Sequence, residues 1–110
     1  MADVDLRLVA ARVARGEASA FRAIVEVTRG AMYRLAARLT GNLGDAEDAL
    51  QEAYVDAYRA LSQGKWDGRS KVETWLYRIV TNACLDLLRS RDEQGRERVS
   101  EPKYDGLVSA

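Results

Sequence analysis

Hydrophobic residues recur along most of the chain at the three- and four-residue spacings typical of amphipathic α-helices. The first such segment covers residues 4–15 and places Leu6, Val9 and Val13 on one side, with Gly16 as its end. The second segment runs from about residue 18 to residue 40. Its apolar stripe comprises Phe21, Ile24, Val25, Thr28, Met32, Leu35, Ala36 and Leu39.

A third helix is predicted over residues 46–62, after a turn at residues 41–44. Asp45 has the position of an N-cap, and the acidic residues that follow it suit the positive end of the helix dipole. The inner face of this helix is predicted to consist of Ala46, Leu50, Ala53, Tyr54, Ala57 and Leu61.

A fourth helix is predicted from Lys71 to about Arg91, after a loop at residues 63–69. Ser70 and Glu73 form the S-x-x-E pattern of a capping box, which marks its start. Its inner face is predicted to consist of Leu76, Val80, Ala83 and Leu87, with Cys84 as a small buried packing residue beside them.

Together these patterns predict an all-α fold, a compact bundle of three to four helices. A chain of 110 residues is enough for one small domain with one modest core. We expect that domain to occupy residues 1–91. Residues 92–110 are polar and aperiodic, which predicts a flexible C-terminal tail of the kind that links domains.

Composition argues against an enzyme. The chain has no His, only one Cys and no Gly-rich phosphate loop, so we expect neither catalysis nor a cofactor. The absence of His and the single Cys also disfavour a zinc site. Charged residues interrupt the N-terminal segment every few positions, which excludes a signal peptide or membrane span there and predicts a cytoplasmic protein.

Charge is distributed unevenly along the chain, although its net value is zero. Residues 1–44 carry seven Arg and four acidic residues, whereas residues 45–62 carry five acidic residues and a single Arg. Residues 63–91 carry six basic and three acidic residues. An acidic helix is thus followed by a basic segment that can attract phosphate groups.

The acidic helix has three interpretations. Asp45, Asp48, Glu52 and Asp56 lie roughly along one helical face, so a metal cluster is one of them. We prefer a solvated acidic face, because no His and no second carboxylate helix accompany these residues. The third interpretation is a docking surface for a basic partner.

The basic segment is more informative, because it combines a polar helical stripe with aromatic residues. Arg78, Asn82, Asp86 and Arg89 share one outward stripe of the fourth helix, and Arg and Asn suit phosphates and base edges. Other residues of this segment suit stacking on exposed bases and attraction of the DNA backbone; they are Trp66, Trp75, Tyr77, Lys65, Arg69 and Lys71. The alternative for Trp75 and Tyr77 is that they are core anchors.

Two motifs in this half of the chain resemble region 2 of the extracytoplasmic-function (ECF) sigma factors, small members of the sigma-70 family of bacterial transcription initiation factors. The first is D-A-E-D-x-x-Q-E within DAEDALQEAYVDAYRAL. The second is T-W-L-Y-R-I-x-x-N-x-x-x-D-x-x-R within ETWLYRIVTNACLDLLRSR. The resemblance covers about residues 18–91, and these motifs are more specific than amphipathic helices require.

The resemblance implies a partner for the acidic helix. Residues 45–61 resemble region 2.2, which in this family binds the clamp helices of the β′ subunit of core RNA polymerase. The matching polymerase-binding positions are Asp48, Gln51, Glu52 and Asp56.

It also implies a DNA target, the non-template strand of the promoter −10 element. Residues 64–75 resemble region 2.3 and the loop that captures a flipped-out base, and residues 76–91 resemble the recognition helix, region 2.4. The expected DNA-binding residues are Lys65, Trp66, Arg69, Lys71, Trp75, Arg78, Asn82, Asp86 and Arg89. Trp75-Leu76 stands where primary sigma factors carry two Trp residues, which implies weaker melting and stricter promoter dependence.

Two further expectations concern regulation and the missing part of the family pattern. An anti-sigma factor is an expected partner, and the alternative function is a helical module that such a regulator binds without DNA reading. ECF sigma factors normally continue into region 4, which reads the −35 element. Residues 1–110 contain no segment that resembles region 4, so we expect either a fragment or a truncated homologue, and the linker-like sequence after residue 91 favours the fragment.

Overall fold

The computed structural model describes residues 4–100, with side chains up to Glu93, as four α-helices and one short 3₁₀-helix. They are α1 (Leu6–Ala14), η1 (Ala18–Ala20), α2 (Phe21–Thr40), α3 (Leu43–Ser62) and α4 (Val72–Ser100). In the described residues there is no strand, so the predicted all-α class is confirmed. The apolar periodicity of the sequence thus corresponds to real helices in every predicted segment.

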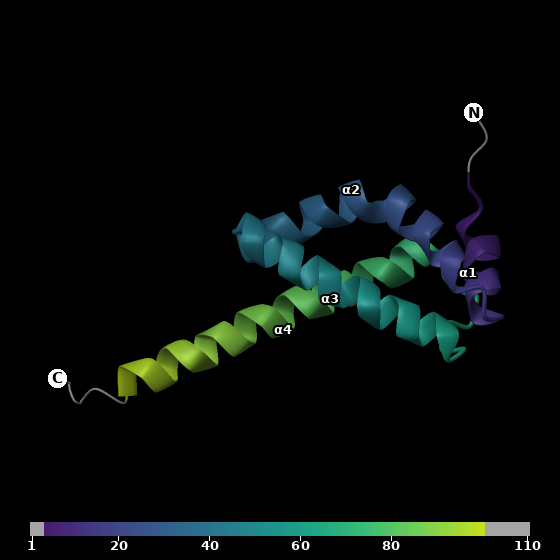
Figure 1. Ribbon diagram of the computed structural model, residues 1–110. Coiled ribbons are helices and arrows are strands. Elements are labelled where there is room, and N and C mark those ends of the chain that lie inside the picture. The colour runs from purple at the N-terminus through teal and green to yellow at the C-terminus, as the bar shows by residue number, and fades with distance from the viewer. Residues whose placement is uncertain (1–3, 101–110) are drawn as a thin grey trace.

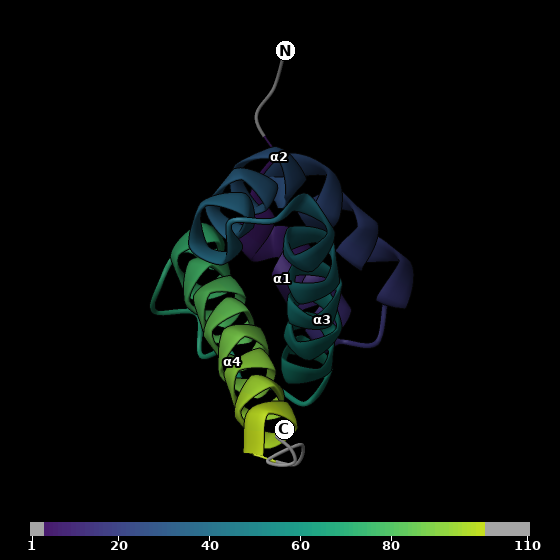
Figure 2. The same ribbon diagram turned by 90° about the vertical axis from the view of Figure 1, so that its left-hand side faces the viewer.

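The helices form a bundle in which α2, α3 and α4 pack against one another (Figure 1). α2 lies across one side of the α3–α4 pair, and α1 covers the end of the bundle where α3 ends and α4 begins. The end-on view shows α3 and α4 side by side below α2 (Figure 2). α4 continues beyond the ends of its neighbours.

The main core lies between α2, α3 and α4. Its fully buried residues include Ala36, Leu50, Leu76, Val80 and Cys84. α3 contributes a row of small side chains to this core, Ala46, Ala49, Ala53 and Ala57. Small residues on one helical face allow neighbouring helices to approach closely while larger residues from the partners fill the space.

A second buried cluster lies under α1 and joins the two ends of the loop between α3 and α4. It consists of Leu6, Val9, Ala10, Val13, Ala20, Ile24, Leu61 and Val72. Leu61 is in the last turn of α3, and Val72 is the first residue of α4. The predicted inner face of residues 4–15 is confirmed, because Leu6, Val9 and Val13 are all buried.

The start of α3 differs from the prediction. Asn42, not Asp45, is the N-cap: its side-chain oxygen accepts a hydrogen bond from the Asp45 backbone N–H at 2.9 Å. Gly41 precedes it with φ 70°, a left-handed conformation that glycine adopts at low cost and that ends α2. The Asp45 carboxylate is therefore free for a tertiary contact.

α4 also ends later than predicted. The sequence placed its end near Arg91, whereas the helix continues to Ser100. Residues 92–100 are polar and lack apolar periodicity in the sequence, so the pattern did not reveal this extension. The assignment of residues 92–110 to an interdomain linker stays a prediction, and residues 101–110 lie outside the described part. No helix among the described residues is long and apolar enough to cross a membrane.

Candidate functional site

α3 presents two grooves, one on each side of its exposed face. The groove toward α4 has a volume of about 390 Å³ and is lined by three acidic residues of α3: Asp48, Glu52 and Asp56. Asp86 and Ser90 of α4 line the opposite wall. Three of the four predicted polymerase-binding residues therefore share one strongly acidic groove. Asp86, which was predicted to contact DNA, lines the same groove.

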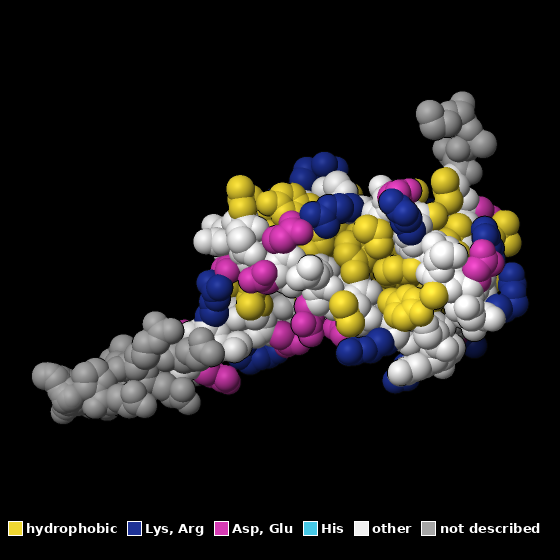
Figure 3. All heavy atoms as spheres, viewed as in Figure 1, with side chains coloured by type: hydrophobic (Ala, Val, Ile, Leu, Met, Phe, Trp, Pro, Cys, Tyr) yellow, Lys and Arg dark blue, Asp and Glu magenta, His cyan; other side chains and the backbone are white. Residues whose placement is uncertain are grey.

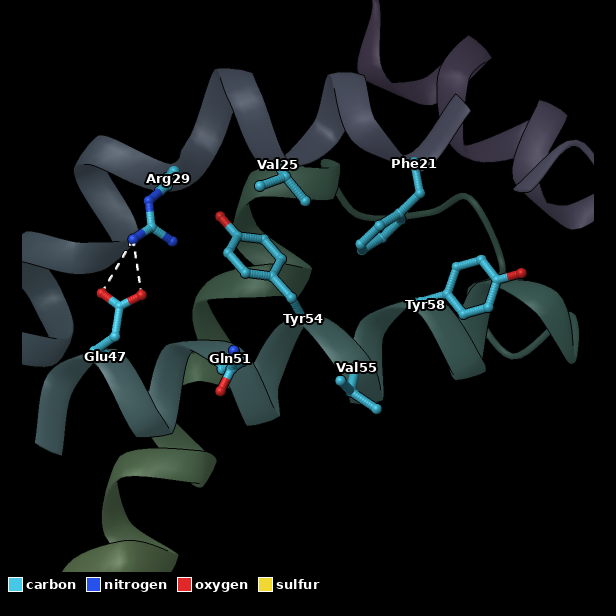
Figure 4. Close-up of a pocket in the computed structure, with 8 residues that line it drawn as sticks. All are labelled: Phe21, Val25, Arg29, Glu47, Gln51, Tyr54, Val55 and Tyr58. Atoms are coloured by element: carbon cyan, nitrogen blue, oxygen red, sulfur yellow. Dashed lines mark hydrogen bonds and ion pairs between the residues drawn. The ribbon is translucent and has the colours of Figure 1, made fainter. Parts of the chain in front are cut away.

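The groove toward α2 is apolar and has a volume of about 350 Å³. Gln51, the fourth predicted polymerase-binding residue, lies in this groove and not with the acidic ones. Residues of both helices line it, namely Phe21, Val25, Arg29, Glu47, Gln51, Tyr54, Val55 and Tyr58 (Figure 4). The space-filling view shows hydrophobic side chains gathered between α2 and α3, with charged side chains around them (Figure 3).

Aromatic rings form the walls of the apolar groove. The ring of Phe21 meets those of Tyr54 and Tyr58 edge to face, with centroids 6.2 Å and 5.5 Å apart. Val55 lies beside them with 45% of its surface exposed. Sequence reasoning did not identify this groove as a site; the signal that could have revealed it is Val55, an apolar residue four positions after the outward-facing Gln51.

The hydroxyl groups of Thr28 and Tyr54 form a buried hydrogen-bonded pair beside the groove. The Thr28 hydroxyl donates to the carbonyl of Ile24 at 2.7 Å, so its oxygen accepts from the Tyr54 hydroxyl, 2.6 Å away. Burial raises the pKa of Tyr54, because the neutral phenol is favoured over the charged phenolate in a buried site. The Tyr54 ring is thereby fixed between α2 and α3.

One end of the groove is closed by an ion pair between α2 and α3. A single guanidinium nitrogen of Arg29 lies 3.0 Å and 2.9 Å from the two carboxylate oxygens of Glu47 (Figure 4). This contact raises the pKa of Arg29, first through the hydrogen bond and then through the charge of Glu47. Both side chains are about half exposed, so the pair adds little stability and mainly orients the rim.

The loop between α3 and α4 brings two Trp residues together. The rings of Trp66 and Trp75 have centroids 6.3 Å apart and an interplanar angle of 50°. Both rings are half-buried and pack against the cluster under α1. Trp75 thus packs against the core with one part of its surface and leaves another part accessible, and its contact with DNA bases stays a prediction.

The predicted phosphate-binding residues of the loop are exposed. Lys65, Arg69 and Lys71 all project into solvent. The Arg69 backbone N–H donates to the Asp67 side chain at 2.9 Å, and the Arg69 guanidinium lies 3.7 Å from the same carboxylate. A short turn stabilised by Asp67 therefore presents these cations.

The outward stripe of α4 is exposed as predicted. Arg78, Asn82, Asp86 and Arg89 all lie on the solvent side, opposite the buried Leu76 and Val80. Arg89 forms an ion pair with Asp86, one turn earlier. Arg78 and Asn82 therefore dominate the chemistry of the first half of the stripe, whereas the charge of Arg89 is partly balanced by Asp86.

Two other candidate features are Cys84 and the carboxylates of α3. Cys84 is fully buried, which confirms its predicted packing role, and burial raises the pKa of its thiol. Within residues 4–93, no group of three or more His, Cys, Asp or Glu side chains is placed to hold a metal ion. The carboxylates of α3 line a groove without converging on a point.

Comparison with known families gives one match that covers most of the bundle. The profile of the family described as sigma-70 region 2 matches residues 24–94. The matched segment includes most of α2, all of α3 and the described side chains of α4, but not α1.

Curated proteins give similar matches. The chain is 39% identical over 80 residues to the ECF RNA polymerase sigma factor SigW of Bacillus subtilis, covering 73% of this chain and 42% of that protein. It is 41% identical over 85 residues to the ECF RNA polymerase sigma factor SigM of Mycobacterium tuberculosis, covering 77% and 42%. The ECF RNA polymerase sigma-E factor of Escherichia coli is 38% identical over 77 residues, covering 70% and 39%. The chain thus spans less than half the length of these relatives, and no solved structure gave a significant match.

Proposed function

The chain belongs to the sigma-70 region 2 family, in its ECF group, and from this we propose that it docks on core RNA polymerase and helps to read and melt the promoter −10 element. The observation that carries the proposal is that the two motifs are exposed on different helices. The docking motif is exposed along α3, and the DNA-reading motif is exposed on α4 and the loop before it. One helical bundle carries both surfaces.

For docking, we propose that the clamp helices of the β′ subunit lie along α3. The apolar groove offers surface that a partner helix can bury, and burial of apolar area supplies most of the free energy of such contacts. Asp48, Glu52 and Asp56 offer negative charge to a partner with a basic rim. The two grooves would thus supply affinity and orientation respectively.

For DNA, we propose that the exposed residues of the loop and α4 hold the melted non-template strand. Lys65, Arg69 and Lys71 would contact phosphates, while Arg78 and Asn82 would read base edges. Extruding a base from the stack costs a few kcal/mol. Partial stacking on the half-buried pair Trp66 and Trp75 would offset part of this cost.

This role is non-catalytic, and it places the protein's action in the cytoplasm with RNA polymerase. We also propose an anti-sigma factor as a regulator. A regulator that covered the apolar groove would bury Val55 and Tyr58 and would compete directly with polymerase docking. The competition follows from the fact that two partners cannot occupy one groove.

The experiment compares the chain with its triple variant Lys65→Ala, Arg69→Ala and Arg89→Ala. Fluorescence anisotropy would measure binding to core RNA polymerase, and then binding of that complex to a single-stranded −10 oligonucleotide. We expect the variant to lose DNA binding by at least about tenfold and to bind core polymerase as the parent does. Unchanged DNA binding would contradict the DNA role, and failure of the parent chain to bind core polymerase would contradict the docking role.

A further inference from the structure

We propose that α1 positions the loop between α3 and α4 for DNA reading, and that Arg7 is the positioning residue. The inference rests on the proposed function, because it assigns a purpose to the loop that the DNA strand would contact. It concerns a part of the chain that lies outside residues 24–94, the segment matched by the family.

The central observation is a hydrogen bond between segments far apart in sequence. The Arg7 guanidinium donates to the backbone carbonyl of Gly68 at 3.0 Å, across 61 residues. Among the described residues, no other hydrogen bond joins residues 66–70 to the rest of the protein. The bond between Arg69 and Asp67 is internal to this segment. Arg7 is therefore the polar tether of the loop.

The tether acts at the point where the loop turns. Gly68 has φ 81°, in the left-handed region that other residues rarely adopt. Its neighbours Asp67 and Arg69 form the short turn that presents the predicted phosphate-binding side chains. A donor fixed on the Gly68 carbonyl restricts how this turn can rotate, because the carbonyl must keep facing α1.

Apolar packing places Arg7 where it can do this. Leu6 and Val9 of α1 are buried in the same cluster as Leu61 and Val72, the residues that anchor the two ends of the loop. Trp66 packs against that cluster as well. α1 therefore lies at the end of the bundle where α3 ends and α4 begins (Figure 1), and the exposed Arg7 in its first turn reaches the loop backbone.

The physical consequence is preorganisation. A loop that already has its bound conformation loses less conformational entropy when the strand binds. Hydrogen bonds from a charged donor are stronger than neutral ones, but an exposed one is weakened by water. We expect loss of the tether to weaken binding of a matched −10 strand by about three- to tenfold, while docking on core polymerase is unchanged.

The test uses Arg7→Ala, Arg7→Lys and the matched control Arg15→Ala, which removes another exposed arginine from the end of α1. Each variant, bound to core polymerase, would be titrated with a −10 oligonucleotide and with a shuffled one. We expect Arg7→Ala to reduce the ratio of matched to shuffled affinity, Arg7→Lys to restore part of it, and Arg15→Ala to leave it unchanged. Equal losses in Arg7→Ala and Arg15→Ala would overturn the proposal, because a charge effect alone would explain them.

A second readout does not depend on DNA. In a Trp75→Phe background, Trp66 is the single Trp, and acrylamide quenching reports its exposure. We expect Arg7→Ala to increase quenching of Trp66 without lowering the thermal midpoint by more than a few degrees. Unchanged quenching would overturn the tether. If the parent chain fails to prefer the −10 strand, the proposed function fails, while quenching still decides whether Arg7 holds the loop.

Discussion

Arg91 of α4 forms a two-pronged ion pair with Asp45 in the first turn of α3. The distances are 2.7 Å from Nη1 to Oδ2 and 2.5 Å from Nη2 to Oδ1. The Asp45 side chain is only 9% exposed, whereas that of Arg91 is 53% exposed. Asp45, the first acid of the D-A-E-D motif, thus ties α3 to α4, while Asp48, Glu52 and Asp56 line the acidic groove.

Removing this ion pair should destabilise the bundle. Asp45→Asn keeps the size of the side chain but leaves Arg91 without its charged partner, so we expect the free energy of unfolding to fall by about 1–2 kcal/mol. This is less than for a fully buried pair, because water screens Arg91. Urea denaturation would measure the change. Asp48→Asn is the control, since Asp48 is exposed on the same helix and should change stability by less than about 0.5 kcal/mol. Equal effects of the two substitutions would contradict a structural role for Asp45.

Alkaline pH should reduce the contribution of Tyr54 to the stability of the folded state. Its pKa is raised above the ordinary value of 10.0, mainly by burial, so the folded state keeps a proton that the unfolded state releases. The stability that depends on this proton is complete below the unfolded pKa and is lost as the pH rises through the folded pKa. The stability difference between the parent chain and Tyr54→Phe should therefore shrink as the pH rises above the ordinary pKa of 10.0.

The same comparison has an internal control in Thr28→Val. This substitution removes the acceptor of the Tyr54 hydrogen bond and should cost about 1 kcal/mol at neutral pH. It leaves Tyr54 buried, so the decline of stability with alkaline pH should remain. A constant difference between the parent chain and Tyr54→Phe from neutral to strongly alkaline pH would show that the Tyr54 hydroxyl is not shielded from water.

The apolar groove should be required for polymerase docking. Val55→Asp introduces a charge into the groove, where a docked helix would have to bury it, so we expect affinity for core polymerase to fall by at least about tenfold. The matched control is Val27→Asp, because Val27 is 50% exposed on α2 but does not line the groove. Competition binding with labelled parent chain would measure both variants. Docking of Val55→Asp at the parent affinity would exclude the groove from the interface.

Asn82 should contribute sequence specificity and not general affinity. Its amide lies on the exposed stripe of α4, and a base-edge contact of this kind is worth about 1–3 kcal/mol of discrimination. Asn82→Ala should therefore weaken binding of the −10 strand more than binding of a shuffled strand. Lys71→Ala offers the contrast, since loss of a phosphate contact should weaken both strands equally and lower the salt dependence. An equal loss on all strands with Asn82→Ala would contradict base reading.

Local sequence pattern was sufficient for the helices and their inner faces. Leu50, Ala53, Leu76 and Val80 were assigned to the core from periodicity alone, and all four are buried. This succeeds because burial at helical spacing is a property of each segment by itself. The ends of helices were less well determined, because Asn42 and Asp45 are both good N-caps and only the conformation of the turn selects between them.

The contacts that shape the candidate sites depend on the tertiary structure. Asp45 meets Arg91 across 46 residues, and Arg7 meets Gly68 across 61. No periodicity relates such pairs, because their distance is set by how whole helices pack. The same packing separates Gln51 from Asp48 and Glu52 and divides one sequence motif between an apolar and an acidic groove. The sequence alone thus determined the packed helical segments and indicated their family, although it missed the extension of α4 to Ser100. Packing of the helices decided which side chains share a surface.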